Sequence, residues 1–259
     1  MLQRSRADVR GGLRLKTKNI STFAVLTALA ALGLGAVPAG AAEEDGVALA
    51  IIYDTSGSMK ELVRDNNGQQ AAKYLIANRA LVAITRQLQT FATNTASGAP
   101  RKIYTGLFIF SGIGAKEAVK FGPFDAAAIQ QWAGNFANPS GNTPLGKSLE
   151  TAGQAVLNSP LSRKHVLVIT DGMNTAGPSP SAIMPKLKLQ AEQKHTALSV
   201  HFVAFDVDAK VFDPLKKQGA TVVGAADEKQ LNTQLDYIMQ RKILLEEEEP
   251  PKTPNKPGN

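Results

Sequence analysis

Two patterns of apolar residues alternate along the chain and predict its secondary structure. Short runs of apolar and β-branched residues, bounded by polar or glycine-rich segments, indicate strands. These predicted strands cover residues 47–53, 102–110, 118–121, 165–172, 198–205 and 221–223. The first run contains no charged residue, which is typical of a strand that is covered on both faces in a parallel sheet.

Between these runs, apolar residues recur at spacings of three and four, which is the period of an amphipathic helix. In residues 71–91 the apolar face carries Tyr74, Ala77, Leu81, Ile84, Leu88 and Phe91. Further helices are predicted at 123–136, 145–157, 181–194, 211–218 and 228–245, and a polar loop at 64–70. Strands alternating with helices predict an α/β fold with a doubly wound, mostly parallel central sheet and helices on both faces.

The two ends of the chain differ in composition from the body. Residues 1–42 contain a basic segment, an apolar stretch and small residues that fit the A-x-A cleavage rule after Pro38. We interpret them as a signal peptide, with an uncleaved membrane anchor as the alternative because the apolar stretch approaches spanning length. Either interpretation places the body, residues 43–245, outside the cytoplasm, as a secreted, periplasmic or membrane-anchored domain. The acidic and proline-rich residues 246–259 are predicted to be a disordered tail.

The charge distribution gives little support to nucleic-acid binding. The chain has a net charge of +7, but residues 1–42 hold six of its 29 basic residues and one of its 22 acidic residues. The remainder, with 23 basic and 21 acidic residues, carries only +2 and no basic cluster interleaved with aromatic residues. There are no cysteines, which excludes disulfides and thiolate metal ligands.

Polar side chains follow two of the predicted strands, at the edge where a parallel sheet binds its ligands. Asp54, Ser56 and Ser58 come directly after the first strand. Asp171 ends another apolar strand, and Thr143 lies in the Gly/Asn/Pro-rich loop between them. Asp, Ser and Gly are also ordinary turn residues. Two carboxylates and three hydroxyls brought together, however, would form a site for a hard cation completed by water.

The segments DTSGS (54–58), GNTPLG (141–146) and ITDG (169–172) together resemble the von Willebrand factor type A (vWA) domain. They match its metal-ion-dependent adhesion site (MIDAS), which consists of Asp-x-Ser-x-Ser, a distant threonine and a distant aspartate. All five positions are present in the right order, and the resemblance covers about residues 47–242. It implies a doubly wound sheet with one antiparallel edge strand and a metal at the carboxyl end of the sheet.

By this resemblance, Ser56, Ser58 and Thr143 coordinate Mg²⁺ (or Mn²⁺ or Ca²⁺) directly, while Asp54 and Asp171 act mainly through water. Neutral direct ligands leave the ion with much of its positive charge, so it attracts an acidic side chain of a protein partner. The expected function is metal-dependent protein recognition and not catalysis. An adhesion role and a periplasmic accessory or assembly role both stay open. A structural role without metal ranks lower because all five metal positions are present.

A second motif competes for the same loop. Residues 141–148, GNTPLGKS, fit the phosphate-binding pattern G-x-x-x-x-G-K-[ST], in which Lys147 would reach the phosphates of a nucleotide. A loop of this kind must follow a buried strand directly. The preceding residues, WAGNFANPS, are rich in Gly, Asn and Pro and predict no strand. An NTPase is therefore the alternative to the binding function, and the predicted export also argues against ATP as a substrate.

Overall fold

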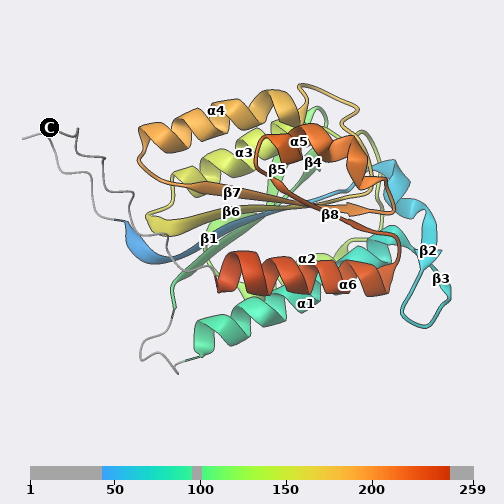
Figure 1. Cartoon of the computed structure of the whole chain (residues 1–259). Helices are drawn as coiled ribbons and strands as arrows, with labels where there is room; N and C mark the ends of the chain where they lie inside the picture. The colour runs from blue at the N-terminus through green and yellow to red at the C-terminus, as the bar shows by residue number, and fades with distance from the viewer. Residues whose placement is uncertain (1–42, 95–100, 246–259) are drawn as a thin grey trace, which may run out of the picture. The chain divides into compact units, whose positions relative to one another are not determined.

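The computed structural model describes residues 43–94 and 101–245 of the chain (Figure 1). The predicted signal peptide or anchor at 1–42 and the predicted tail at 246–259 lie outside these residues, and both stay predictions. Among the helices of the described part, none combines the length and the apolar content needed to cross a membrane.

A six-stranded sheet in the order β5-β4-β1-β6-β7-β8 forms the centre of the fold. Its strands are β1 (Glu44–Tyr53), β4 (Ile103–Ser111), β5 (Gly114–Pro123), β6 (Leu161–Thr170), β7 (Leu198–Phe205) and β8 (Thr221–Ala225). All neighbouring strands are parallel except β5, which runs antiparallel to β4 at one edge. The prediction of a mostly parallel sheet in an α/β fold is confirmed.

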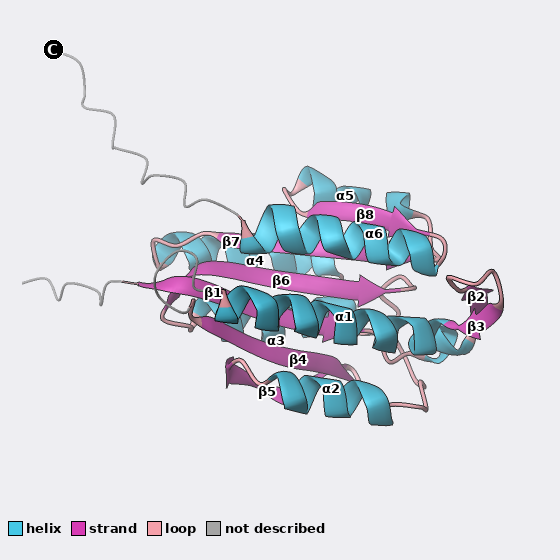
Figure 2. Cartoon of the chain, turned by 90° about the horizontal axis from the view of Figure 1, so that it is seen from below, coloured by secondary structure: helices cyan, strands magenta, loops and turns pink. Residues whose placement is uncertain are grey.

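Helices cover both faces of this sheet (Figures 1 and 2). One face packs against α1 (Lys73–Thr93), α2 (Ala126–Asn135) and α6 (Glu228–Ile238). The other packs against α3 (Leu145–Leu157), α4 (Pro180–Gln193) and α5 (Asp213–Lys217). Shorter helical turns are η1 (Gly57–Lys60), η2 (Ala209–Phe212) and the π-helical η3 (Met239–Leu244). Each predicted helix has a counterpart, so the doubly wound arrangement is confirmed.

The position of β1 in the sheet explains why residues 47–53 contain no charge. It lies between β4 and β6, and every side chain from 47 to 53 is fully buried. Leu49 and Ile51 pack into the core on the α1 face, whereas Ala50 and Ile52 pack into the core on the α3 face. Because both sets are excluded from water, neither face of the strand tolerates a polar residue, and the usual alternation of a half-exposed strand is absent.

The structure differs from the sequence-based prediction beside the carboxyl end of β1. The segment predicted as a polar loop is part of a small antiparallel hairpin, formed by β2 (Leu62–Arg64) and β3 (Gln70–Ala72). Its turn is closed by Asp65, whose Oδ1 accepts hydrogen bonds from the backbone N–H of Asn67 and Gln69 at 2.9 and 2.8 Å. Strands of three residues are too short for the alternation that identifies longer strands, so the hairpin left no periodic signal.

Candidate metal centre

The five predicted metal ligands come from three segments at the carboxyl edge of the sheet. Asp54 directly follows β1, and its backbone N–H donates to the carbonyl oxygen of Ile169 on β6 at 3.0 Å. Because β1 and β6 are adjacent and parallel, this pairing brings Asp54 and Asp171 to the same edge. The predicted convergence of the two strand-end aspartates is present in the fold.

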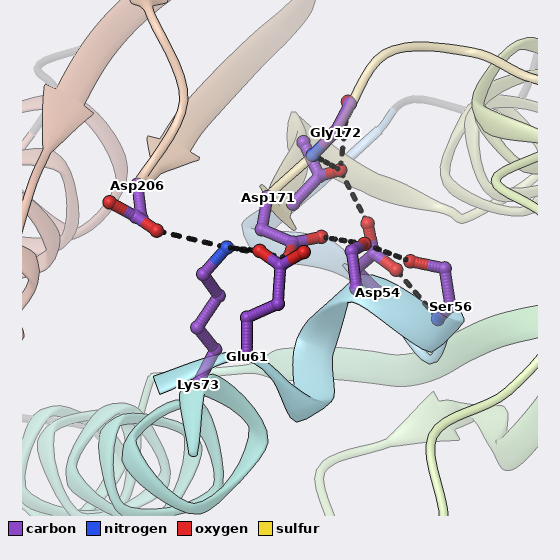
Figure 3. Close-up of polar contacts among 9 residues, drawn as sticks. Asp54, Ser56, Glu61, Lys73, Asp171, Gly172 and Asp206 are labelled. Carbon is purple, nitrogen blue, oxygen red and sulfur yellow. Dashed lines mark hydrogen bonds and ion pairs between the residues drawn. The ribbon is translucent and has the colours of Figure 1, made fainter. Parts of the chain in front are cut away.

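Hydrogen bonds join four of the five predicted residues into one cluster (Figure 3). Ser58 Oγ lies 3.1 Å from Ser56 Oγ and donates to Asp171 Oδ1 at 2.8 Å. The backbone N–H of Ser56 donates to Asp54 Oδ1 at 2.8 Å. These hydrogen bonds bring the side-chain oxygens of Ser56, Ser58 and Asp171 together in series, and oxygen atoms of this kind are the ligands that a hard cation prefers.

Thr143, the fifth predicted residue, is placed by a separate set of contacts. Its backbone N–H donates to Thr175 Oγ1 at 2.8 Å, and its carbonyl accepts from the N–H of Thr175 at 2.9 Å. The hydroxyl oxygen of Thr143 lies close to Gly172, the residue that follows Asp171: a Cβ built on Gly172 would be 3.9 Å from it. The loop that carries Thr143 is tied to the first segment, because the N–H of Gly57 donates to the carbonyl of Gly141.

The two carboxylates are held in an environment that disfavours their charged forms. Asp54 is fully buried, and burial together with the negative charge of Asp171 raises the pKa of Asp54 to about 6, although hydrogen bonds from Ser56 and Thr170 oppose this shift. Burial also raises the pKa of Asp171, against the opposing effects of Ser58 and Lys73. Two buried, mutually repelling carboxylates favour a bound cation, which would relieve both effects.

The donor set fits a hard divalent cation such as Mg²⁺, Mn²⁺ or Ca²⁺, because it consists of carboxylate and hydroxyl oxygens. Within residues 43–94 and 101–245, no three His, Cys, Asp or Glu side chains are grouped so as to hold a metal ion. An ion at this edge of the sheet would therefore depend on the serine and threonine hydroxyls and on water, as well as on Asp54 and Asp171.

Lys73, which the sequence analysis did not single out, adjoins this cluster. Its Nζ lies 2.7 Å from Glu61 Oε2, 2.9 Å from Asp206 Oδ2 and 3.1 Å from Asp171 Oδ2. Only 2% of its side chain is exposed. Burial alone would lower the pKa of Lys73, but its hydrogen bonds to these carboxylates raise the pKa above its ordinary value, so the ammonium is charged.

A signal for Lys73 was present in the sequence. Lys73 stands three and four residues before Ile76 and Ala77, which are buried on the face of α1 that packs into the core. A lysine in phase with a buried stripe must either extend to the surface or find acidic partners. The acidic partners of Lys73 come from the C-cap of η1 and from the residues after β6 and β7. No local sequence pattern predicts that these three segments lie next to Lys73.

The competing phosphate-loop motif lacks its structural context. Residues 141–148 follow α2 and a loop, not a strand. Lys147 forms an ion pair with Glu150 on the same helix, and Ser148 is buried with its hydroxyl donating to the carbonyl of Pro144 at 2.9 Å. The strand–loop–helix unit that cradles phosphates is therefore not formed by this segment.

Comparison with known proteins places the fold. No protein-family model and no curated protein matches the sequence. Solved structures that resemble the chain include the PilB minor pilin of Streptococcus sanguinis (16% identity, TM-score 0.54, 75% of this chain and 61% of that one). Another is proximal thread matrix protein 1 of the mussel byssus (20% identity, TM-score 0.53, 76% of this chain and 48% of that one). A third is the vWF domain of the pilus tip protein Mfa5 of Porphyromonas gingivalis (12% identity, TM-score 0.50, 76% of this chain and 95% of that one).

These similarities show the fold of the chain. The protein has a vWA-like fold, as the resemblance of its motifs led us to expect. The chain spans about three fifths of the length of the minor pilin and about half of the length of the byssus protein. One structure of the byssus protein carries zinc in its MIDAS motif (20% identity, TM-score 0.50, 76% of this chain and 48% of that one).

Proposed function

We propose that the protein is an exported vWA-type binding protein that uses a divalent cation to engage an acidic side chain of a protein partner. The cation would be held by Asp54, Ser56, Ser58, Thr143 and Asp171. One observation carries this proposal: Ser58 Oγ bridges Ser56 Oγ and Asp171 Oδ1 beside a second buried carboxylate, Asp54.

The chemistry of the ligands supports a binding role. Serine and threonine hydroxyls are neutral, so an ion that they coordinate keeps most of its positive charge. That charge attracts an anionic oxygen from outside the protein, and a Glu or Asp carboxylate is the commonest such group on a protein surface. Mg²⁺, Mn²⁺ and Ca²⁺ all accept oxygen ligands of this kind.

Two further observations support a protein partner and a bound metal. Two of the proteins with a similar fold are, by name, a minor pilin and a pilus tip protein, and a third was solved with zinc in its MIDAS.

The basic and apolar residues 1–42 support export, as a cleaved signal peptide or as an anchor. Adhesion and an accessory role in the periplasm remain two versions of the same binding function.

The test is a calorimetric titration of the protein with Mn²⁺ and Mg²⁺. Wild type should bind one ion, and Asp54→Ala should abolish binding because it removes a buried carboxylate from the cluster while β1 keeps its apolar residues. Asp45→Ala is the matched control: Asp45 is on the same strand at its opposite end, and its side chain is 85% exposed. Absence of binding to folded wild type, or equal loss in both variants, would overturn the proposal.

Recognition of a carboxylate is tested on the same proteins. Acetate, as the simplest carboxylate, should displace water from bound Mn²⁺ and so lower the proton relaxation enhancement that the bound ion produces. An enhancement that acetate leaves unchanged would contradict an open coordination position for an acidic partner.

A further inference from the structure

Lys73 connects the candidate metal centre to two other parts of the fold. Its ammonium lies within 3.1 Å of three carboxylates, one from η1's C-cap (Glu61), one after β6 (Asp171) and one after β7 (Asp206). Figure 3 shows Lys73 Nζ between Asp206 on one side and Glu61 and Asp171 on the other. Glu61 and Asp206 are partly exposed, with 67% and 39% of their side chains accessible. Lys73 and Asp171 are buried.

The two oxygens of Asp171 have different partners. Oδ1 accepts a hydrogen bond from Ser58 at 2.8 Å, on the side of the candidate cation site. Oδ2 lies 3.1 Å from Lys73 Nζ, on the opposite side. Turning the plane of this carboxylate away from its present orientation would break both contacts, so Lys73 and Ser58 together hold that orientation.

The same contact has an electrostatic consequence. A cation beside Asp171 Oδ1 and the ammonium beside Oδ2 would share one carboxylate, and their like charges would repel across a buried group. This repulsion opposes cation binding. It also adds positive potential at the place where a partner's carboxylate would approach.

We propose that Lys73 is a positioning residue for the cation site. It holds the orientation of Asp171, and its positive charge weakens cation binding. The same charge strengthens the attraction of the site for the carboxylate of an acidic partner. This inference rests on the proposed function. A purely structural Lys73, serving only to connect α1 with the ends of β6 and β7, would lower stability when replaced and would not strengthen cation binding.

The first test compares Mn²⁺ affinity in wild type and Lys73→Met, which keeps most of the side-chain length and removes the charge. We expect the variant to bind Mn²⁺ at least about tenfold more tightly, because the repulsion is lost and three carboxylates are left without their cation. Mn²⁺ should also raise its melting temperature more than that of wild type. The matched control is Lys102→Met, which removes a charge from an exposed lysine paired with Glu44 at the far end of the sheet and should leave the affinity unchanged.

A second pair of variants covers the case in which Lys73→Met does not fold. The double variant Lys73→Met/Asp206→Asn keeps the net charge of the pair and should still bind Mn²⁺ more tightly than wild type. Asp206→Asn alone removes a competing partner of Lys73, strengthens its contact with Asp171 and should weaken Mn²⁺ binding. Equal or weaker binding by both Lys73 variants would overturn the role of Lys73.

The second readout uses acetate as the carboxylate probe. In Lys73→Met, several-fold more acetate should be needed to displace water from bound Mn²⁺ than in wild type, because the added positive potential is gone. Equal acetate requirements would overturn the proposed effect on the partner. Failure of wild type to bind Mn²⁺ would overturn the proposed function and this inference together, whereas binding that is insensitive to Lys73 would overturn this inference alone.

Discussion

Thr170 Oγ1, at the end of β6, donates a hydrogen bond at 2.6 Å to Oδ2 of Asp54, which directly follows the adjacent strand β1. Both residues are fully buried. Together with the N–H of Ser56 on Oδ1, this contact fixes both oxygens of Asp54 and opposes the rise of its pKa. Thr170 belongs to the candidate metal centre although it is not among the five predicted ligands.

Thr170→Val tests this contact, because valine has nearly the shape of threonine without its hydroxyl. We expect the pKa of Asp54 to rise further and Mn²⁺ affinity at pH 7 to fall by about three- to tenfold, with a loss of about 1–2 kcal/mol of stability. Thr85→Val is the control, since buried Thr85 donates to the carbonyl of Leu81 within α1. Titration calorimetry would contradict the contact's role if the two variants bound Mn²⁺ equally well.

Gly146 stands at a position where a side chain does not fit. A Cβ at Gly146 would lie 2.0 Å from the carbonyl oxygen of Pro178, so the first turn of α3 and the loop after β6 can approach only without it. Gly146→Ala should therefore cost about 2–3 kcal/mol of stability and reduce cation affinity by moving Thr143. This close approach is sufficient to explain a glycine at position 146.

Gly134→Ala provides the matched control for Gly146→Ala. Gly134 lies in α2, and a Cβ there would meet no atom within 4 Å. The substitution should leave stability unchanged or raise it by about 0.5 kcal/mol, because alanine favours the helix. Urea unfolding of both variants is the measurement, and equal free energies of unfolding would contradict the packing argument.

His165 and His201 form a buried pair on β6 and β7, with His165 Nδ1 3.3 Å from His201 Nε2. Burial lowers the pKa of His165 to about 3 and that of His201 to about 4, and the positive charges of Arg163 and Lys242 act in the same direction. Both folded-state values lie below the ordinary 6.5, so the pair's contribution to stability is present above pH 6.5. It is lost as the pH falls toward 4 and 3.

Acidification from pH 7 to pH 5 should therefore cost about 2 kcal/mol of stability per histidine. His201→Leu should reduce this loss, measured as the difference in urea unfolding between the two pH values. Comparison with wild type is essential because Asp54, whose pKa is raised, has the opposite effect: its contribution is present below 3.8 and is lost as the pH rises through 6. An unchanged pH dependence in His201→Leu would contradict the assignment.

The sequence was sufficient for those parts of the fold that depend on local pattern. The uncharged run within β1 and the helical period of α1 are visible in the sequence, because residues 47–53 are buried on both faces of the sheet and α1 is buried along one side. Asp54, Ser56 and Ser58 were found because a motif keeps them together. The roles of Lys73 and Thr170 could not be predicted, since both depend on which strands are neighbours, and that order is set by packing across the whole sheet.

Ser58 and Asp171 are 113 residues apart in the sequence, yet they share one hydrogen bond at the candidate metal centre. Closing so long a loop costs conformational entropy before the contact is made, so we expect this contact to form late in folding. We therefore expect the site to form only after β1 and β6 have paired. A divalent ion would select chains that have completed the middle of the sheet and would slow their unfolding without guiding the early steps of folding.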